Sequence, residues 1–194
     1  MRKIFIVAGH NSIQSGAVMF DGTTEHQHTT ELQSLVLKGV QNRNTVSLEG
    51  SSMQFIVDTQ KLSNARVRDL INSTSRPGSY GIDIHFNNNN PAATGTEIVI
   101  HPNTSPAMKK RAVWLVNEVS KVLDIPLRRR VRTRDYIFPS ETFVGRIGII
   151  EQTNIPMMLL EVCFGNATDM NKYYANKERV AAVIRQAMFT KIFK

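Results

Sequence analysis

The sequence predicts an α/β fold: a single three-layer domain in which helices flank a mixed, mostly parallel sheet. Short apolar runs typical of buried strands alternate along the chain with segments whose apolar residues recur every three to four positions, as in helices. The chain has 194 residues, of which 41% are hydrophobic, so one self-sufficient core is expected. No repeat, linker or low-complexity stretch interrupts this pattern, and residues 1–194 are therefore expected to form one domain.

The first half of the chain is predicted to contain three strands and two helices. A buried strand is expected at residues 1–8, because residues 4–8 are an apolar run, and residues 12–28 carry the turn residues of a loop. A helix is expected to open at Thr29, because apolar residues recur from there at helical spacing. The other expected segments are a strand at 52–57, a helix at 60–72, a loop at 73–79 and an alternating strand at 80–86.

The second half repeats the alternation of strands and helices. Ser105-Pro106 is a helix start signal, because serine caps a first turn and proline is tolerated at its first position. This helix is expected to reach about Leu123. The other expected segments are a strand at 96–101, a basic loop at 128–134, strands at 146–151 and 157–162, and one or two helices from residue 167 to the end.

The chain is strongly basic, with a formal net charge of +8. An excess of this size favours a polyanionic partner: nucleic acid, an anionic membrane or an anionic cell wall. Five arginines fall within residues 128–134, where they form either a solvated loop or a site for phosphate or carboxylate. Nucleic acid is disfavoured, because this cluster lacks interleaved aromatic residues and the chain has no zinc-finger or glycine-rich phosphate motif.

The N-terminal apolar run and the cysteine content exclude several classes. The run at residues 4–8 is shorter than a signal-peptide core of about 7–15 residues or a membrane span of about 20. We therefore expect synthesis in the cytoplasm without a signal peptide, and no membrane insertion. Cys163 is the single cysteine, which excludes an intrachain disulfide and a four-cysteine zinc site.

Three polar residues stand where predicted strands end: His10, His85 and Glu161. A catalytic zinc ion takes three nitrogen or carboxylate ligands and leaves a fourth position for water. The two histidines and a carboxylate from the loop before the first helix would meet that demand, and this loop offers Glu25. Each residue also has a structural alternative. The histidines can be hydrogen-bonded structural residues, and Glu161, which interrupts an apolar run, can form a buried ion pair with an arginine.

Four groups of short motifs follow one another along nearly the whole chain. They are Gly9-His10 with Ser15-Gly16-Ala17; Glu25 ahead of the first long helix; His85-Phe86-Asn87 with Gly95-Thr96-Glu97; and Pro156, an apolar strand, Glu161 and Phe164-Gly165-Asn166 with Asp169. In this order and spacing the chain resembles the zinc-dependent N-acetylmuramoyl-L-alanine amidases, the group that includes bacterial cell-wall hydrolases and phage endolysins.

The resemblance implies a role for each motif. His10, Glu25 and His85 would hold one zinc ion, and Glu161 would be the catalytic acid and base. Asn87 and Arg146, the latter at a position where some phage members carry an arginine, would bind substrate. The implied reaction is hydrolysis of the amide bond between N-acetylmuramic acid and L-alanine in peptidoglycan, and the anionic cell wall would then be the partner of the positive charge.

The resemblance also implies a setting. We expect a monomeric catalytic domain without a separate wall-binding domain. It would act on the cell wall as a phage endolysin after release through a holin pore or lysis, or from a phage particle.

Several alternatives stay open at this point. His26, His28 or Glu31 could replace Glu25 as the third metal ligand. A zinc metallopeptidase or deacetylase would use the same kind of site on another substrate. A wall-binding or virion structural protein without activity could have the same fold.

Overall fold

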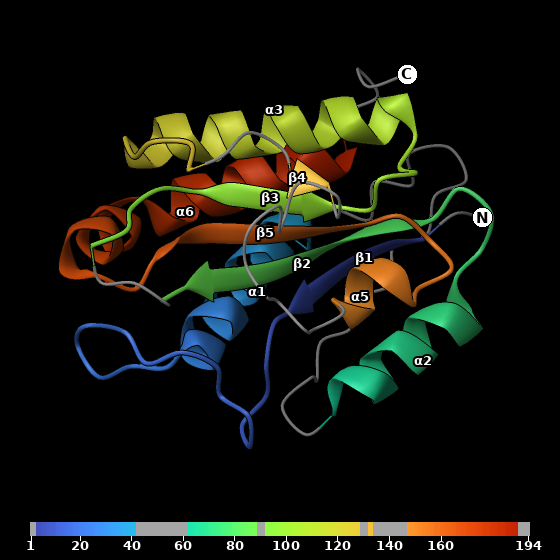
Figure 1. Ribbon diagram of the computed structural model, residues 1–194, viewed down its shortest axis with the longest axis horizontal. Coiled ribbons are helices and arrows are strands. Elements are labelled where there is room, and N and C mark those ends of the chain that lie inside the picture. Colours follow the sequence, from blue (N-terminus) through green and yellow to red (C-terminus); the bar gives the residue numbers. More distant parts are fainter. Residues whose placement is uncertain (1–2, 42–61, 89–91, 129–131, 134–146, 190–194) are drawn as a thin grey trace.

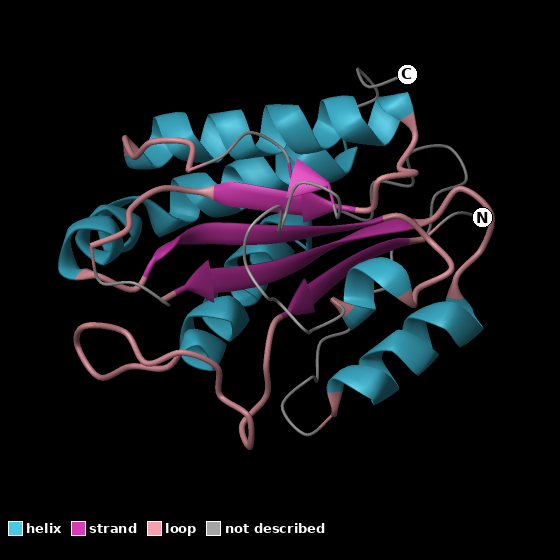
Figure 2. Ribbon diagram, viewed as in Figure 1, coloured by secondary structure: helices cyan, strands magenta, loops and turns pink. Residues whose placement is uncertain are grey.

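A five-stranded sheet crosses the molecule with helices on both faces, which confirms the predicted α/β class and its three layers (Figures 1 and 2). The computed structural model describes residues 3–41, 62–88, 92–128, 132–133 and 147–189. The helices are α1 (Glu25–Gln41), α2 (Asn64–Thr74), α3 (Pro106–Leu123), α5 (Gly148–Glu151) and α6 (Ala167–Phe189). Helices α1, α3 and α6 cover one face of the sheet, and α2 and α5 cover the other. Among the described residues, no helix is long and apolar enough to cross a membrane.

The sheet is mixed and mostly parallel, as predicted. Its strands, in the order in which they lie side by side, are β1 (Ile4–Ala8), β2 (Tyr80–Asn87), β5 (Met157–Phe164), β3 (Glu97–Ile100) and β4 (Arg132–Thr133). Only the pairing of β3 with β5 is antiparallel. Because helices cover both faces, β1 is buried along its whole length, which explains its continuous apolar sequence.

The two faces of the sheet bury different side chains. Toward α1, α3 and α6, residues such as Ile82 and Ile84 of β2 join the larger apolar core. Toward α2 and α5, a smaller apolar core forms around Phe5. Successive side chains of a strand point to opposite faces, so Asp83 and His85 project toward this second face.

The strand register aligns three polar residues across the second face. His85 on β2 is the Cα partner of Glu161 on β5, and Glu161 is in turn the Cα partner of Glu97 on β3. His85 and Glu161 lie within their strands, which continue to Asn87 and Phe164, rather than at the strand ends where the sequence placed them. The register therefore brings together residues that are far apart in the sequence.

Helix α1 begins at Glu25, earlier than the predicted start at Thr29. The backbone N–H of Thr24 donates to the side chain of Gln27 at 2.7 Å, which is half of a capping box. Thr24-Glu25-His26-Gln27 is thus a start signal that the apolar spacing alone did not reveal. Glu25 is the first residue of the helix and not part of the loop before it.

Other boundaries also differ from the prediction. The strand expected at 146–151 is wrong: this segment contains α5, because an apolar run this short cannot be told from a buried helix by periodicity. The loop expected at 128–134 contains β4, which pairs with β3. The helix expected at 60–72 is α2, which begins after its cap, Ser63. The strand expected at 52–57 lies outside the described residues.

Ser105 caps α3 as predicted, since its side chain accepts a hydrogen bond from the backbone N–H of Met108, and Pro106 occupies the first turn. From residue 167 a single helix, α6, continues to Phe189.

Candidate metal centre

His10, Glu25 and His85 converge at one end of β1 and β2. Nε2 of His10 lies 3.0 Å from Oε2 of Glu25, and Nδ1 of His85 lies 2.9 Å from Oε1 of the same carboxylate. One ligand atom from each of the three residues lies within 4.8 Å of the others. Two imidazole nitrogens and one carboxylate oxygen form a donor set typical of catalytic zinc.

Two glycines make this convergence possible. The Cβ of any other residue at position 9 would lie 2.5 Å from Nε2 of His85, and a Cβ at position 16 would lie 2.5 Å from Oε2 of Glu25. Gly16 also has a φ of +74°, which favours glycine. Gly9 and Gly16 therefore give the three ligands the room to approach one another.

The backbone of two neighbouring segments holds the carboxylate of Glu25 in place. Oε2 accepts a hydrogen bond from the N–H of Ala17 at 3.1 Å, and Oε1 accepts one from the N–H of Phe86 at 3.0 Å. Burial would raise the pKa of Glu25, but hydrogen bonds and charge from His10 and His85 outweigh it and hold this pKa well below its usual range. Glu25 is thus an anion, as a metal ligand must be.

Asp83 lies behind His85 on the same face of β2. Its Oδ2 is 3.1 Å from Nε2 of His85, so that the imidazole lies between two carboxylates. Burial lowers the pKa of His85, but the charge and hydrogen bond of Asp83, with the hydrogen bond of Glu25, raise it well above its ordinary value. Metal-ligating histidines usually donate their second ring N–H to such a carboxylate, which orients the ring.

Asp83 was absent from the sequence-based site. The signal that could have found it is the spacing Asp-Ile-His, because residues two apart on a strand share a face. Asp83 is only 5% exposed, and a buried acid on the same face as a candidate ligand is an expected ring-orienting partner.

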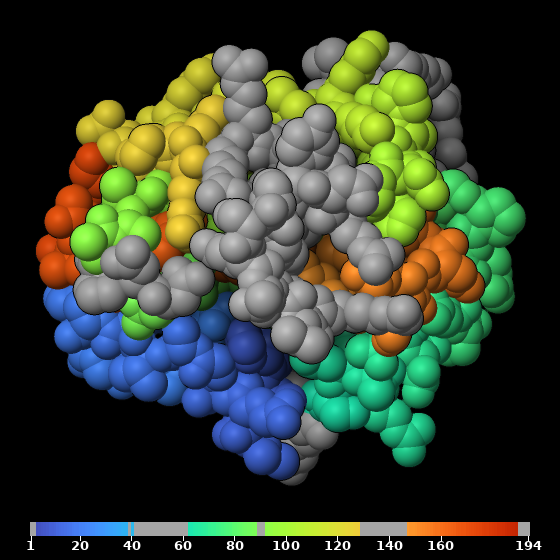
Figure 3. Space-filling view, viewed as in Figure 1, coloured from blue at the N-terminus to red at the C-terminus, as the bar shows by residue number. Residues whose placement is uncertain are grey.

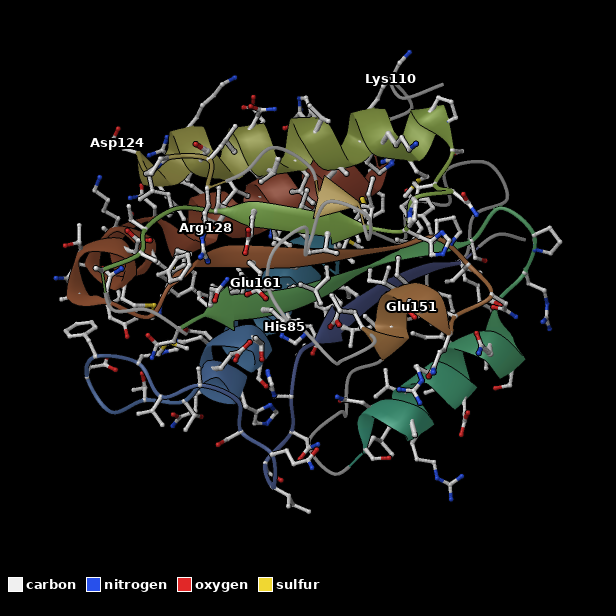
Figure 4. The ribbon with its side chains drawn as sticks, in the orientation of Figure 1. His85, Lys110, Asp124, Arg128, Glu151 and Glu161 are labelled. Carbon is white, nitrogen blue, oxygen red and sulfur yellow. The ribbon has the colours of Figure 1, made fainter. Side chains whose placement is uncertain are left out.

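Glu161 stands beside His85 across the β2–β5 pairing (Figure 4). Burial raises its pKa to about 8; the charge of His85 opposes this shift, while Glu25, Glu97 and Asp83 add to it. Its Oε2 is buried and has no hydrogen-bond partner among the described residues. No described arginine forms an ion pair with it, so the ion-pair alternative has no support in this part of the chain.

Glu97 and Arg128 continue this row toward β3. The side-chain amide of Asn87 donates to Oε1 of Glu97 at 2.9 Å, and the Arg128 guanidinium lies 3.9 Å from the same oxygen. Arg128 also stacks over the ring of Phe164, 4.6 Å from its centroid. This member of the arginine cluster therefore reaches the site. Arg146, the other predicted substrate-binding residue, lies outside the described residues.

The three rival ligands lie elsewhere. His28 packs among Phe86, Tyr173 and Tyr174, with Nε2 2.7 Å from the hydroxyl oxygen of Thr23. The other two rivals are His26, whose ring approaches Thr30, and Glu31, which forms an ion pair with Lys177. The structure thus brings Glu25 next to His10 and His85. It brings none of the three rival ligands to that position.

Comparison with known proteins agrees with this geometry. The family described as N-acetylmuramoyl-L-alanine amidase (Amidase_3) matches residues 4–192. The catalytic domain of CwlV, an N-acetylmuramoyl-L-alanine amidase from Bacillus (Paenibacillus) polymyxa var. colistinus, is 21% identical, with a TM-score of 0.74 and 96% of each chain covered. No curated protein matches the chain significantly.

Two further solved structures share the fold. An N-acetylmuramoyl-L-alanine amidase from Clostridium difficile 630 is 16% identical, with a TM-score of 0.75, covering 96% of this chain and 94% of that one. The catalytic domain of an endolysin targeting Clostridia difficile is 18% identical, with a TM-score of 0.66 and 97% of each chain covered. With its family match over nearly the whole length, the chain belongs to the N-acetylmuramoyl-L-alanine amidases, a family of which zinc dependence is part.

Proposed function

We propose that this chain hydrolyses the amide bond between N-acetylmuramic acid and L-alanine in peptidoglycan, with one zinc ion held by His10, Glu25 and His85. The observation that carries this proposal is the convergence of these three residues beside Glu161, a half-buried residue whose Oε2 is enclosed, in a chain of the amidase family. The residues fit the metal, since two histidines and one carboxylate leave a position for water. A bound zinc ion would lower the pKa of water and polarise the substrate carbonyl.

Glu161 would move the proton in this reaction. Its carboxylate accepts a proton from the attacking water and returns it to the nitrogen of the leaving L-alanine, so that the C–N bond breaks with a neutral amine as leaving group. A pKa of about 8 suits both steps, because the group gains and loses a proton near neutral pH. No described residue forms a hydrogen bond with Oε2, which leaves this oxygen available for the exchange.

Asp83, Gly9 and Gly16 would support the reaction by positioning the ligands. Asp83 holds the ring of His85 through Nε2, which leaves Nδ1 directed at the Glu25 carboxylate and the metal position. Neighbouring glycines keep the space between the ligands free of other side chains. We propose that Asn87 and Arg146 contact the substrate, with Asn87 held by Glu97.

For the setting, we propose a monomeric phage endolysin that is made in the cytoplasm and reaches the wall after release through a holin pore or lysis, or from a phage particle. The similarity to an endolysin catalytic domain supports this setting, and the two bacterial amidases keep a host enzyme as its competitor. A net charge of +8 would favour adsorption to an anionic wall, an attraction that salt weakens.

Digestion of purified cell walls tests the reaction. An amidase releases peptides with free L-alanine amino groups and creates no new reducing sugar ends; a chelator should stop the release and added zinc should restore it. New amino groups on other residues would indicate a metallopeptidase, and free glucosamine a deacetylase. Walls left intact by the zinc-loaded protein would contradict the proposal and favour a wall-binding or structural role.

A further inference from the structure

A pocket of about 180 Å³ opens beside the metal centre, on the side of the sheet covered by α2 and α5. His10 and His85 form one wall of it, so the pocket adjoins the position of the reacting bond. The opposite wall comes from α2 and α5, which lie next to each other beyond β1 in Figure 1. In Figure 3 the blue N-terminal segment meets the green α2 on this face.

The lining of the pocket is mixed: besides the two histidines, Asn64, Arg68 and Asp83 lie among apolar residues. Val7, Val67 and Leu159 contribute apolar side chains, and Arg68 of α2 contributes a guanidinium. Asp83 also belongs to the lining: its Oδ2 contacts Nε2 of His85, and its Oδ1 is buried without a hydrogen-bond partner among the described residues. Arg68 is the one arginine or lysine among the described residues that line the pocket, on the wall opposite His85.

Arg68 has no counterion of its own in the part of the chain that the structure describes: no described carboxylate lies within ion-pair distance of it. Its side chain lies over Gly148, where a Cβ would come within 2.5 Å of Nη1. The absent side chain at position 148 thus leaves room for the guanidinium at the rim of the pocket. A half-buried guanidinium without a partner is a strong site for a carboxylate, which it binds through two parallel hydrogen bonds.

Charge and size indicate which part of the substrate enters. On one side of the scissile amide lies a neutral, N-acetylated sugar strand, and on the other lies a peptide whose second residue carries a free carboxylate. Ligand pockets usually measure about 300–1,000 Å³, so this smaller one suits an amino-acid residue better than a disaccharide. Arg68 complements the peptide and offers nothing specific to the sugar.

We propose that this pocket binds the peptide stem of the substrate and that Arg68 pairs with the free carboxylate of the residue that follows L-alanine. The proposal rests on the proposed function, since it takes the metal centre as the place where the lactyl–alanine amide is cut. It makes Arg68 a specificity residue: walls in which this carboxylate is amidated lose the ion pair and become poorer substrates.

Two synthetic substrates that differ only at this group provide the test: the γ-methylamides of N-acetylmuramoyl-L-alanyl-D-glutamate and of N-acetylmuramoyl-L-alanyl-D-isoglutamine. The methylamide blocks the γ-carboxyl group, as the next peptide bond does in the wall, so the α-carboxylate is the one carboxylate of the peptide in which they differ. The wild-type chain should cleave the glutamate form with a kcat/KM about 10- to 100-fold higher, the usual effect of one charged hydrogen-bonded contact. Arg68→Met should bring the ratio close to one. Arg66→Met is the matched control, because Arg66 is exposed on the same helix and does not line the pocket, and it should keep the wild-type ratio.

A binding measurement separates this proposal from the proposed function. In calorimetry with the zinc-loaded full chain, L-alanyl-D-glutamate γ-methylamide should bind more tightly than L-alanyl-D-isoglutamine γ-methylamide, and Arg68→Met should abolish the difference. Gly148→Ala, which displaces the guanidinium without removing it, should reduce the preference. These results do not depend on turnover.

The cleavage and binding results together distinguish failure of the Arg68 assignment from failure of the proposed amidase reaction. Equal cleavage and equal binding of the two forms by the wild-type chain, or a preference that survives in Arg68→Met, would overturn the assignment of Arg68 and leave the amidase reaction standing. Arg68-dependent binding of the glutamate peptide without cleavage of either substrate would contradict the proposed function. It would support the assignment of the pocket to the peptide stem. A disaccharide of the wall that carries no peptide should not displace the glutamate peptide. If it does so equally well in the wild-type chain and in Arg68→Met, the pocket binds the sugar and the proposal is wrong.

Discussion

The two faces of the sheet differ in role: one packs the larger apolar core, and the other carries residues of the metal centre. On the face toward α1, α3 and α6, Ile82 and Ile84 of β2 are fully buried among apolar side chains. On the other face, the residues between and after them are Asp83 and His85, of which His85 lies beside Glu161. Because side chains alternate across the sheet, residues that stabilise the core and residues of the metal centre are neighbours along the same strand.

Substitutions of two adjacent residues of β2, one on each face, test this difference most directly. His85→Ala should abolish tight zinc binding, because it removes one of three protein ligands, while the fold persists. Ile84→Ala should keep zinc but lower the free energy of unfolding by about 2–5 kcal/mol, the usual cost of a core cavity. Zinc content by elemental analysis and unfolding in denaturant measure the two effects. Full zinc occupancy in both His85→Ala and His10→Ala would end the metal assignment.

Glu161→Gln tests the polar face without changing its shape. The variant should keep its zinc but lose at least about 100-fold in kcat on cell walls, since general acid–base groups typically contribute 10²–10⁴-fold. Leu160→Ala, its neighbour on the apolar face, is the control: it should lose stability and keep most of kcat at low temperature. Turnover at the wild-type rate in Glu161→Gln would remove this residue from the reaction.

Asp83→Asn should weaken zinc binding by about 10- to 100-fold, the usual effect of losing an orienting partner of a histidine ligand. The amide has nearly the shape of the carboxylate but does not hold the ring of His85 with the same charge. Competition with a fluorescent chelator gives the affinity, and nitrogen NMR of the histidine ring reports which nitrogen carries the proton. Unchanged affinity with an unchanged ring tautomer would show that Asp83 does not orient His85.

The raised pKa of Glu161 predicts a pH dependence of stability in the metal-free protein. Its folded pKa is about 8 and its ordinary value is 4.5, so the folded state binds the extra proton between these values. The contribution to stability is therefore complete below about pH 4.5 and is lost as pH rises toward 8, at no more than about 1.4 kcal/mol per unit for one group. Denaturant unfolding with a chelator, from pH 5 to 8, should show a shallower fall in Glu161→Gln; equal slopes would contradict this pKa.

Much of the fold followed from local patterns. Apolar runs predicted β1 and β5, alternation predicted β2, and the Ser105-Pro106 signal predicted the start of α3, because each depends on neighbouring residues. The prediction is wrong for α5, where a short apolar run does not distinguish strand from helix, and for the start of α1, where the capping residues from Thr24 to Gln27 lie outside the apolar spacing. Strand β4 could not have been found locally, since its pairing with β3 joins distant segments.

By itself the sequence determined the fold class, the basic charge and the candidate residues His10, His85 and Glu161, because composition and periodicity are local properties of the chain. Resemblance supplied Glu25, and His26, His28 and Glu31 remained its rivals. Only the tertiary structure placed Glu25 between the two histidines, put Asp83 behind His85 and opened a pocket under Arg68. These relations depend on strand register and helix placement, which bring together residues that no local pattern connects.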